Sequence, residues 1–185
     1  MIQFSIAETS NDLVAILDLQ KANLAASLTP FEIQSQGFVT VTHKYDELSA
    51  LNELENHIIA KEGDKVIGYV LAMTKASATA LPVLEPMFVV FDQINYQNKP
   101  VSNYRYLVVG QVCIDKEYRG KGIFDQIYTA YKNRFQSKYD FAITEIAATN
   151  LRSQKAHQRI GFKELHRYFA PDQTEWSIVI WDWNN

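Results

Sequence analysis

The middle of the chain reads Gln111-Val112-Cys113-Ile114-Asp115-Lys116-Glu117-Tyr118-Arg119-Gly120-Lys121-Gly122-Ile123-Phe124. An apolar, strand-like run enters a Gly-Lys-Gly turn, and residues 125–135 leave the turn as a helix-like segment. Glycine lets backbone N–H groups approach an anion, and a helix N-terminus adds partial positive charge. This order of strand, glycine loop and helix predicts that the chain binds a phosphorylated cofactor.

Two common phosphate-binding motifs fit this loop poorly. A nucleotide P-loop ends in Gly-Lys-Ser/Thr, whereas here Gly122 is followed by Ile123 and Phe124, so no hydroxyl is placed for magnesium. A dinucleotide fingerprint G-x-G-x-x-G needs a third glycine at position 125, which is aspartate. The P-loop is therefore excluded, and the dinucleotide-binding motif fits this loop only weakly.

A third pattern involves a second segment, which reads Asn150-x-x-Ser153-x-x-Ala156-His157-x-x-Ile160-Gly161-Phe162. This segment resembles the second signature of the GCN5-related N-acetyltransferases, and residues 119–124 resemble their R/Q-x-x-G-x-G/A loop. Two linked motifs are far more specific than either alone, and together they cover about the C-terminal half. Phe124 departs from the usual Gly or Ala, and His157 stands where many members carry Tyr.

The resemblance implies a mixed α/β fold in residues 1–185, taken as one domain. The expected core is a mostly antiparallel, twisted sheet of about seven strands, flanked by helices, with the fourth and fifth strands splayed apart. The strand patterns fall at residues 2–6, 57–61, 65–74, 105–115, 141–146, 162–169 and 176–183. Helix patterns follow Ser10, Asp46 and Asn150, and residues 81–91 are a further helix candidate.

Three segments are less regular. Residues 25–45 are expected to form a substrate-side loop or short helices, although residues 38–42 are rich in β-forming side chains. Residues 95–100 resemble a turn, and residues 75–102 are the best candidate for an insertion that sets specificity.

Composition and charge limit the class of protein. The 185 residues are 47% hydrophobic, with no apolar run near the roughly 20 residues of a membrane span and no signal-like start, which predicts a cytoplasmic protein without membrane contact. No Cys or His cluster has metal-ligand spacing. Residues 115–163 carry ten Lys/Arg against five Asp/Glu, which suits a polyanionic small ligand, although solvated helix faces explain many of these charges equally well. Nucleic-acid binding is disfavoured, because the chain is acidic overall and has no basic stripe interleaved with aromatics.

The resemblance also implies a cofactor, acetyl-CoA, and residues that hold it. The splayed strand would pair its backbone with the pantetheine arm, and the N–H groups of the glycine loop would hold the pyrophosphate. Asn150 would bond the arm, or it caps the helix that follows; Ser153 is a neighbouring contact or only a first-turn residue. The cofactor-binding residues expected in this way are Val112, Cys113, Ile114, Arg119, Gly120, Lys121, Gly122, Ile123, Phe124, Asn150 and Ser153, with Gln111 beside them.

Two residues are candidates for proton transfer. By resemblance, His157 takes the place of a Tyr that protonates the leaving thiolate, and an imidazole can do the same work. By resemblance, Glu145 is the base, with a pKa that burial would raise. A packed or solvated histidine and an ion-paired strand glutamate are the alternatives, and Glu85, Asp92, Tyr104 and Tyr168 are less specific substitutes for the base. A nucleophilic role for Cys113 is rejected, because no activating group is near it in sequence.

The function implied is N-acyl transfer from acetyl-CoA to a primary amine of a small molecule or peptide, directly within a ternary complex. A non-catalytic acyl-CoA-binding or sensing module of the same fold is the alternative. An interaction domain built on the aromatic C-terminus is weaker, because residues 176–183 alternate as a packed strand does. A homodimer is compatible with the resemblance.

Overall fold

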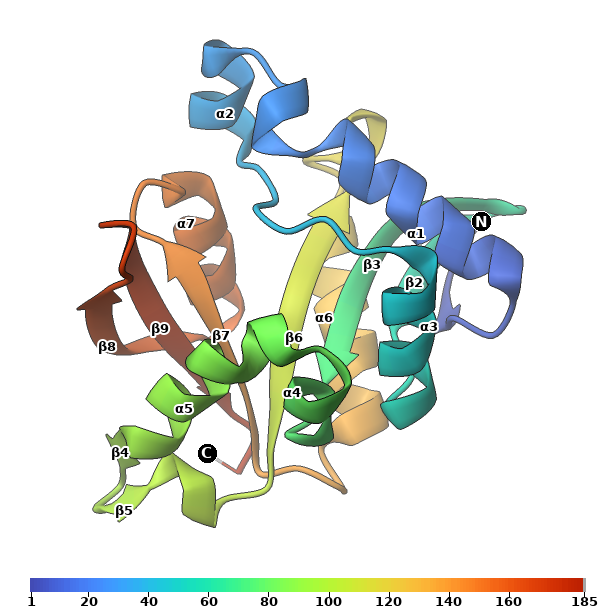
Figure 1. Cartoon of the computed structure of the whole chain (residues 1–185). Coiled ribbons are helices and arrows are strands. Elements are labelled where there is room, and N and C mark those ends of the chain that lie inside the picture. The colour runs from blue at the N-terminus through green and yellow to red at the C-terminus, as the bar shows by residue number, and fades with distance from the viewer. Residues whose placement is uncertain (185) are drawn as a thin grey trace.

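The computed structural model describes residues 1–184, with every side chain among them except that of Gln34. Its main feature is a seven-stranded sheet in the order β1-β2-β3-β6-β7-β9-β8 (Figure 1). Neighbouring strands are antiparallel except β6 and β7, which are parallel. The strand bounds are β1 Ile2–Ile6, β2 Ile58–Glu62, β3 Lys65–Met73, β6 Tyr106–Ile114, β7 Phe141–Ala147, β8 Lys163–Phe169 and β9 Glu175–Asp182. The sheet confirms the predicted fold class.

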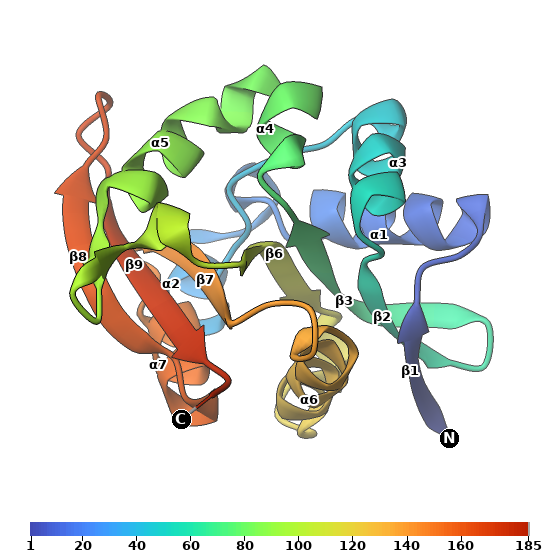
Figure 2. The ribbon, with the colours of Figure 1, turned by 90° about the horizontal axis from the view of Figure 1, so that it is seen from below.

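Helices cover both faces of this sheet, as Figure 2 shows. One face, called the front face here, carries α1, α3, α4 and α5; the back face carries α6 and α7. The short helix α2 lies at the end of the sheet where β6 and β7 separate (Figure 1). The helix bounds are α1 Ser10–Ala22, α2 Pro30–Gln36, α3 Tyr45–Leu54, α4 Ala76–Ala80, α5 Glu85–Gln93, α6 Ile123–Phe135 and α7 Leu151–Ile160.

Local sequence explains where α1 begins and which side of α6 is buried. Thr9 and Asp12 form a capping box at the start of α1, which satisfies backbone donors that have no partner inside the helix. On α6, Ile123, Ile127 and Tyr131 recur every four residues and are all buried, so one stripe of this helix faces the sheet.

Each face of the sheet has its own hydrophobic core. The front core joins Leu13 and Ile16 of α1 to Phe91 of α5 and to side chains of β3, β6, β7 and β9. The back core joins the buried stripe of α6 to Phe162 and Trp183. Because successive strand residues alternate between these cores, neighbouring residues of β7 point to opposite faces. This alternation decides on which side each predicted site residue lies.

Among the irregular segments, residues 25–45 form short helices and loop, as expected, whereas other details differ from the sequence patterns. Residues 38–42 form no strand, and only Val39 makes an isolated bridge, to Leu24, although their side chains are β-forming. Residues 81–91 begin as a short 3-10 turn at Pro82–Leu84 before α5. Residues 95–100 form a two-stranded hairpin, β4 Asn95–Tyr96 and β5 Lys99–Pro100, whose turn residues Gln97 and Asn98 have positive φ. A turn-like composition predicts this bend but not the short strands on either side of it.

Candidate functional site

The two central strands of the sheet separate at one end. β6 and β7 pair only over Tyr106–Val108 with Phe141–Ile143. At the fork, Thr144 Oγ1 donates a hydrogen bond of 2.7 Å to the carbonyl oxygen of Val109. Beyond the fork the two strands diverge, which leaves the backbone of β6 open toward β7, as the family resemblance implies (Figure 1).

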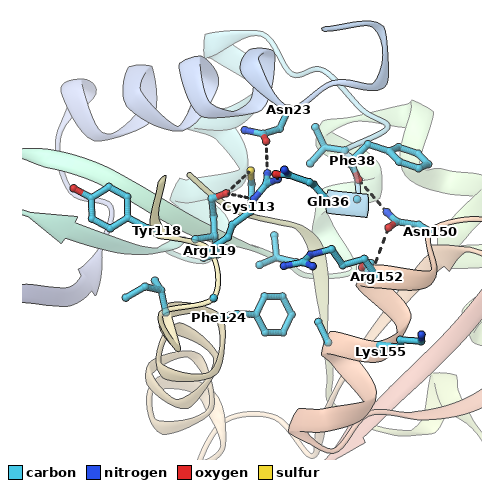
Figure 3. Close-up of a pocket in the computed structure, with 18 of the residues that line it drawn as sticks. Asn23, Gln36, Phe38, Cys113, Tyr118, Arg119, Phe124, Asn150, Arg152 and Lys155 are labelled. Atoms are coloured by element: carbon cyan, nitrogen blue, oxygen red, sulfur yellow. Dashed lines mark hydrogen bonds between the residues drawn. The ribbon is translucent and has the colours of Figure 1, made fainter. Parts of the chain in front are cut away.

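A cavity of about 710 Å³ lies at this fork, in the size range of small-molecule and cofactor sites (Figure 3). Its walls come from the end of β6, the glycine loop with the start of α6, the first turns of α7, and residues 35–39, called the crossing segment here. Ten of the predicted cofactor-binding residues line it, namely Val112, Cys113, Ile114, Arg119, Gly120, Gly122, Ile123, Phe124, Asn150 and Ser153. Lys121 does not line it, and its ammonium lies 5.0 Å from the ring centroid of Tyr118.

The glycine loop has the backbone shape of an anion cradle. Gly120 and Gly122 both have φ of +76°, a conformation that L side chains rarely adopt, and Gly122 is the N-cap of α6. A Cβ added to Gly120 would meet no protein atom within 4 Å. The N–H groups at the start of α6 therefore border an open volume, and the helix N-terminus adds positive potential to it.

Cations without acidic partners surround the same volume. Arg119, Arg152 and Lys155 line the cavity, and none of the described carboxylates lies within salt-bridge distance of them. The fourth lining cation, Arg159, is paired with Asp125 at 2.6 Å. Three unneutralised cations beside the cradle suit a ligand with several phosphates.

The side chain of Arg119 turns away from the cradle, as Figure 3 shows. Its Nη1 donates to Gln36 Oε1 at 2.6 Å, its Nε donates to the carbonyl of Ile114 at 3.0 Å, and its Nη2 bonds Asn23. Arg119 therefore joins the end of β6 to α1 and the crossing segment through neutral partners, and its charge remains unpaired beside the cavity.

The side chain of Asn150 caps α7 and also binds the crossing segment. Its Oδ1 accepts from the Ser153 backbone N–H at 3.3 Å, which confirms the capping prediction. Its Nδ2 donates to the carbonyl of Phe38 at 3.1 Å and so ties the crossing segment to α7. Gly37 has φ of +73°, and a Cβ there would lie 2.9 Å from Asn150 Oδ1, so this contact needs glycine.

A second, smaller cavity of about 70 Å³ lies deeper in the fork. Glu145 and His157 both line it, together with Gln111, Ser153 and Trp176. Glu145 lies between Thr144 and Ile146, which face the back core or the fork, so it points to the front face, whereas His157 packs in the back layer against Tyr128 and Phe162. The structure thus brings the two predicted proton-transfer residues to one cavity from opposite faces of the sheet.

Glu145 is half-buried and has a raised pKa, because burial penalises its charged form more than a hydrogen bond from Tyr168 favours it. Tyr168 Oη donates to Glu145 Oε2 at 2.6 Å. A carboxylate in such a setting can accept a proton near neutral pH more readily than an exposed one. Among the weaker candidates for the base, Glu85, Asp92 and Tyr104 line neither cavity.

His157 is 2% exposed and has partners on both ring nitrogens. Its Nδ1 lies 2.8 Å from the carbonyl of Ser153, so Nδ1 carries the hydrogen; Nε2 then accepts from the Tyr128 hydroxyl at 2.7 Å. Burial lowers its pKa to about 4, so the ring is neutral at pH 7. A proton can leave this ring only if one of the two hydrogen bonds is exchanged.

Cys113 is a buried, free thiol. Burial raises its pKa to about 12, so it stays protonated and is a poor nucleophile. Phe124, the departure in the glycine loop, packs its ring against Tyr128 and His157 at centroid distances of 4.9 and 5.3 Å. Its ring therefore fills space between α6 and α7 and leaves the backbone of the loop unchanged.

Sequence reasoning missed the partners of the predicted residues. Tyr128 lies in the regular apolar stripe of α6, where nothing distinguishes it from a core residue. Asn23 and the crossing segment lie outside the two motifs on which the sequence prediction rested. In the described residues 1–184 no helix is long and apolar enough to cross a membrane, and no group of three His, Cys, Asp or Glu side chains is placed to hold a metal.

Comparison with known proteins gives a family and a fold. The sequence pattern of the acetyltransferase (GNAT) family matches residues 21–162. No curated protein matches the sequence. Among solved structures, the ribosomal-protein-S18-alanine N-acetyltransferase from Escherichia coli is similar at 14% identity and a TM-score of 0.63, over 98% of this chain and 94% of that one.

Two further structures share the fold. The NatC complex bound to Gag peptide and CoA contains a chain 13% identical to this one, with a TM-score of 0.66 and coverage of 98% of both chains. A spermidine N-acetyltransferase chimera from Vibrio cholerae and hSSAT is 16% identical, with a TM-score of 0.59, over 98% of this chain and 95% of that one. At such identities the likeness establishes the fold alone.

Proposed function

The chain belongs to the acetyltransferase (GNAT) family, and from that premise we propose that it transfers an acetyl group from acetyl-CoA to a primary amine. The proposed acceptor is a small molecule or a peptide, and transfer is direct, within a ternary complex. Acetyl-CoA is the cofactor of the family, and when bound it supplies an activated thioester.

The observation that carries the proposal is the cradle beside the open fork. Gly120 and Gly122 present backbone N–H groups to a cavity of about 710 Å³ that also holds the unpaired charges of Arg119, Arg152 and Lys155. We assign the pyrophosphate to the backbone of residues 119–124 and the pantetheine arm to the free backbone of residues 112–114. The residues present therefore fit a long, polyanionic cofactor with an amide-containing arm.

Within this proposal Glu145 is the base. An acceptor amine is charged at neutral pH and must lose a proton before it can attack. Glu145 lines the deeper cavity, has a raised pKa and has no ion-pair partner among the described residues, so it can hold the incoming ammonium and take its proton. Because Glu145 points to the front face, we expect this step on the face opposite α6 and α7.

His157 stays a prediction as the acid that protonates the thiolate. It lines the deeper cavity from the back face, where the glycine loop and α6 lie, which supports the role. One of its two hydrogen bonds, to Ser153 or to Tyr128, must be exchanged first, so we expect His157 to act only after the cofactor has displaced that partner. Cys113 forms no covalent intermediate in this proposal, because its thiol stays protonated.

The acceptor class remains the broadest part of the proposal. One structural neighbour is described as acting on the alanine of a ribosomal protein and another as acting on spermidine. The shared fold therefore accommodates both peptide and small-molecule acceptors, and the proposal names both.

The test combines cofactor binding with turnover. Calorimetry with acetyl-CoA should give a dissociation constant in the micromolar range or below, about −7 to −9 kcal/mol. Thiol release from acetyl-CoA is then followed across a panel of polyamines, aminoalkyl compounds and peptides, with Glu145→Gln and His157→Phe beside the wild type. Turnover that Glu145→Gln abolishes supports the proposal. Binding without turnover on any amine favours a non-catalytic acyl-CoA-binding module, and absence of binding refutes both.

A further inference from the structure

Glu145 and Tyr168 form a hydrogen-bonded pair that reaches across a strand. Glu145 on β7 lies opposite Ile178 of β9, and Tyr168 on β8 lies opposite Trp176 of the same strand. The Tyr168 hydroxyl thus crosses β9 diagonally to donate to Glu145 Oε2 at 2.6 Å. This is a short, charge-assisted contact between two strands that are not neighbours.

This bond is the one that fixes the carboxylate. Among the described residues Glu145 accepts no other hydrogen bond and has no salt bridge, so Oε1 is left without a protein partner. Tyr168 is itself held, because its ring packs against the front core. Burial and the nearby carboxylate raise the pKa of the Tyr168 hydroxyl, so it keeps its hydrogen and can only donate to Glu145.

The surroundings of the pair are otherwise neutral. The deeper cavity is lined by apolar, aromatic and amide or hydroxyl side chains, and His157 and Glu145 are its titratable groups. An ammonium group entering this cavity meets one carboxylate, and in a site of low polarity an unpaired carboxylate attracts it strongly.

We propose that Tyr168 is a positioning residue for acetyl transfer: it holds Glu145 Oε2, so that Oε1 is presented to the ammonium group of the acceptor. The inference rests on the proposed function, because it gives a role to a partner of the proposed base. Tyr168 touches the carboxylate and is assigned no contact with the acceptor.

Removing the Tyr168 hydroxyl changes both the orientation of the Glu145 carboxylate and its pKa. Without the Tyr168 bond, burial alone acts on Glu145, so its pKa rises further. A base must be ionised, so the acid limb of the rate profile moves to higher pH. His157 is the other titratable group that lines the deeper cavity, and the charge of Asp172, in the turn after β8, acts on Tyr168. The remaining charged or titratable groups on the strands of the pair are Lys163, Glu164, His166 and Arg167 on β8 and Glu175 and Asp182 on β9.

The test is Tyr168→Phe, with Tyr96→Phe as the matched control. The Tyr96 hydroxyl also donates to a carboxylate, Asp182 Oδ2 at 2.8 Å, but it lies in the β4-β5 hairpin and lines neither cavity. The profile of kcat/KM against pH is measured for both variants, and the Glu145 carboxyl is titrated by carbon-13 NMR in the acetyl-CoA complex. Thermal unfolding is measured to check that both variants are folded.

For Tyr168→Phe we expect kcat to fall at least tenfold at neutral pH, with affinity for acetyl-CoA unchanged, and the acid limb and the Glu145 titration both to move up by about one pH unit. Tyr96→Phe should match the wild type in kcat, acetyl-CoA affinity, acid limb and Glu145 titration. If the wild type is active and Tyr168→Phe keeps the wild-type kcat and acid limb, the inference is overturned. A wild type that turns over no amine refutes the proposed function instead, and in that case an unmoved Glu145 titration in Tyr168→Phe overturns the pairing as well.

Discussion

Replacing Gly120 by alanine separates the conformational cost of the glycine loop from its role in binding. Gly120 has φ of +76°, and an alanine in that region costs about 1–2 kcal/mol. An added Cβ meets no protein atom within 4 Å, so no steric clash inside the protein adds to this cost. Because Gly120 lines the cavity, we expect the methyl group to crowd the space from which a phosphate approaches the backbone.

Gly63 provides the matched control. It has φ of +58° in the β2-β3 turn, and a Cβ there also meets nothing within 4 Å. Gly63→Ala and Gly120→Ala should therefore lower the free energy of unfolding by similar amounts, about 1–2 kcal/mol, which lowers Tm by about 2–8 °C for a chain of this size.

The two variants should differ only in binding. Calorimetry with coenzyme A should show Gly63→Ala at the wild-type affinity and Gly120→Ala weaker by at least tenfold, about 1.4 kcal/mol. If the two variants have equal affinity, the N–H groups of the loop do not hold the pyrophosphate, and the assignment of the cradle is refuted. Unequal Tm losses would show instead that the loop is strained beyond its positive φ.

Three further predictions follow from individual side chains. Arg152→Gln should weaken coenzyme A binding and reduce its dependence on salt, whereas Lys21→Gln on α1, outside the cavity, should change neither; calorimetry at two ionic strengths measures both. His157 has a pKa of about 4 in the folded chain, below its ordinary 6.5, so the unfolded chain binds more protons between these values. Stability should therefore fall as pH drops from 6.5 to 4, by about 3 kcal/mol from this residue, and urea titrations of His157→Gln should show a shallower fall. Cys113→Ala should retain turnover within a few fold, because the thiol has a pKa of about 12 and is not a nucleophile; loss of the acetyl-transfer rate with folding intact would contradict this.

The cofactor side of the site could be predicted from sequence because its chemistry is local. Backbone N–H groups, positive φ and a helix start are properties of consecutive residues, so Gly120 and Gly122 indicate an anion cradle, which the second motif makes specific. The cap at Asn150 is equally local, since it is bonded to the backbone of Ser153 only three residues away. The splay of β6 and β7 followed from family resemblance, and nothing in the strand composition indicates where their pairing stops.

The partners of these residues could not be predicted, because they depend on tertiary packing. Tyr168 meets Glu145 only through the register of β9 with β7 and β8. Tyr128 meets His157 only because α6 and α7 pack together on the back face. Residues 38–42 have strand-forming side chains, yet their only bridge is the isolated one from Val39 to Leu24, so this segment crosses the end of the sheet without joining it. The β-forming side chains alone would have favoured a strand there, whereas the expectation of a loop or short helices over residues 25–45 is confirmed.

The most direct test of the account is a crystal structure of the protein with acetyl-CoA. The account predicts pyrophosphate oxygens within hydrogen-bond distance of the backbone N–H groups of residues 119–124, and a thioester carbonyl at the fork beside Glu145 and His157. A pyrophosphate bound away from Gly120 and Gly122, or a thioester that does not reach the fork between β6 and β7, would contradict it.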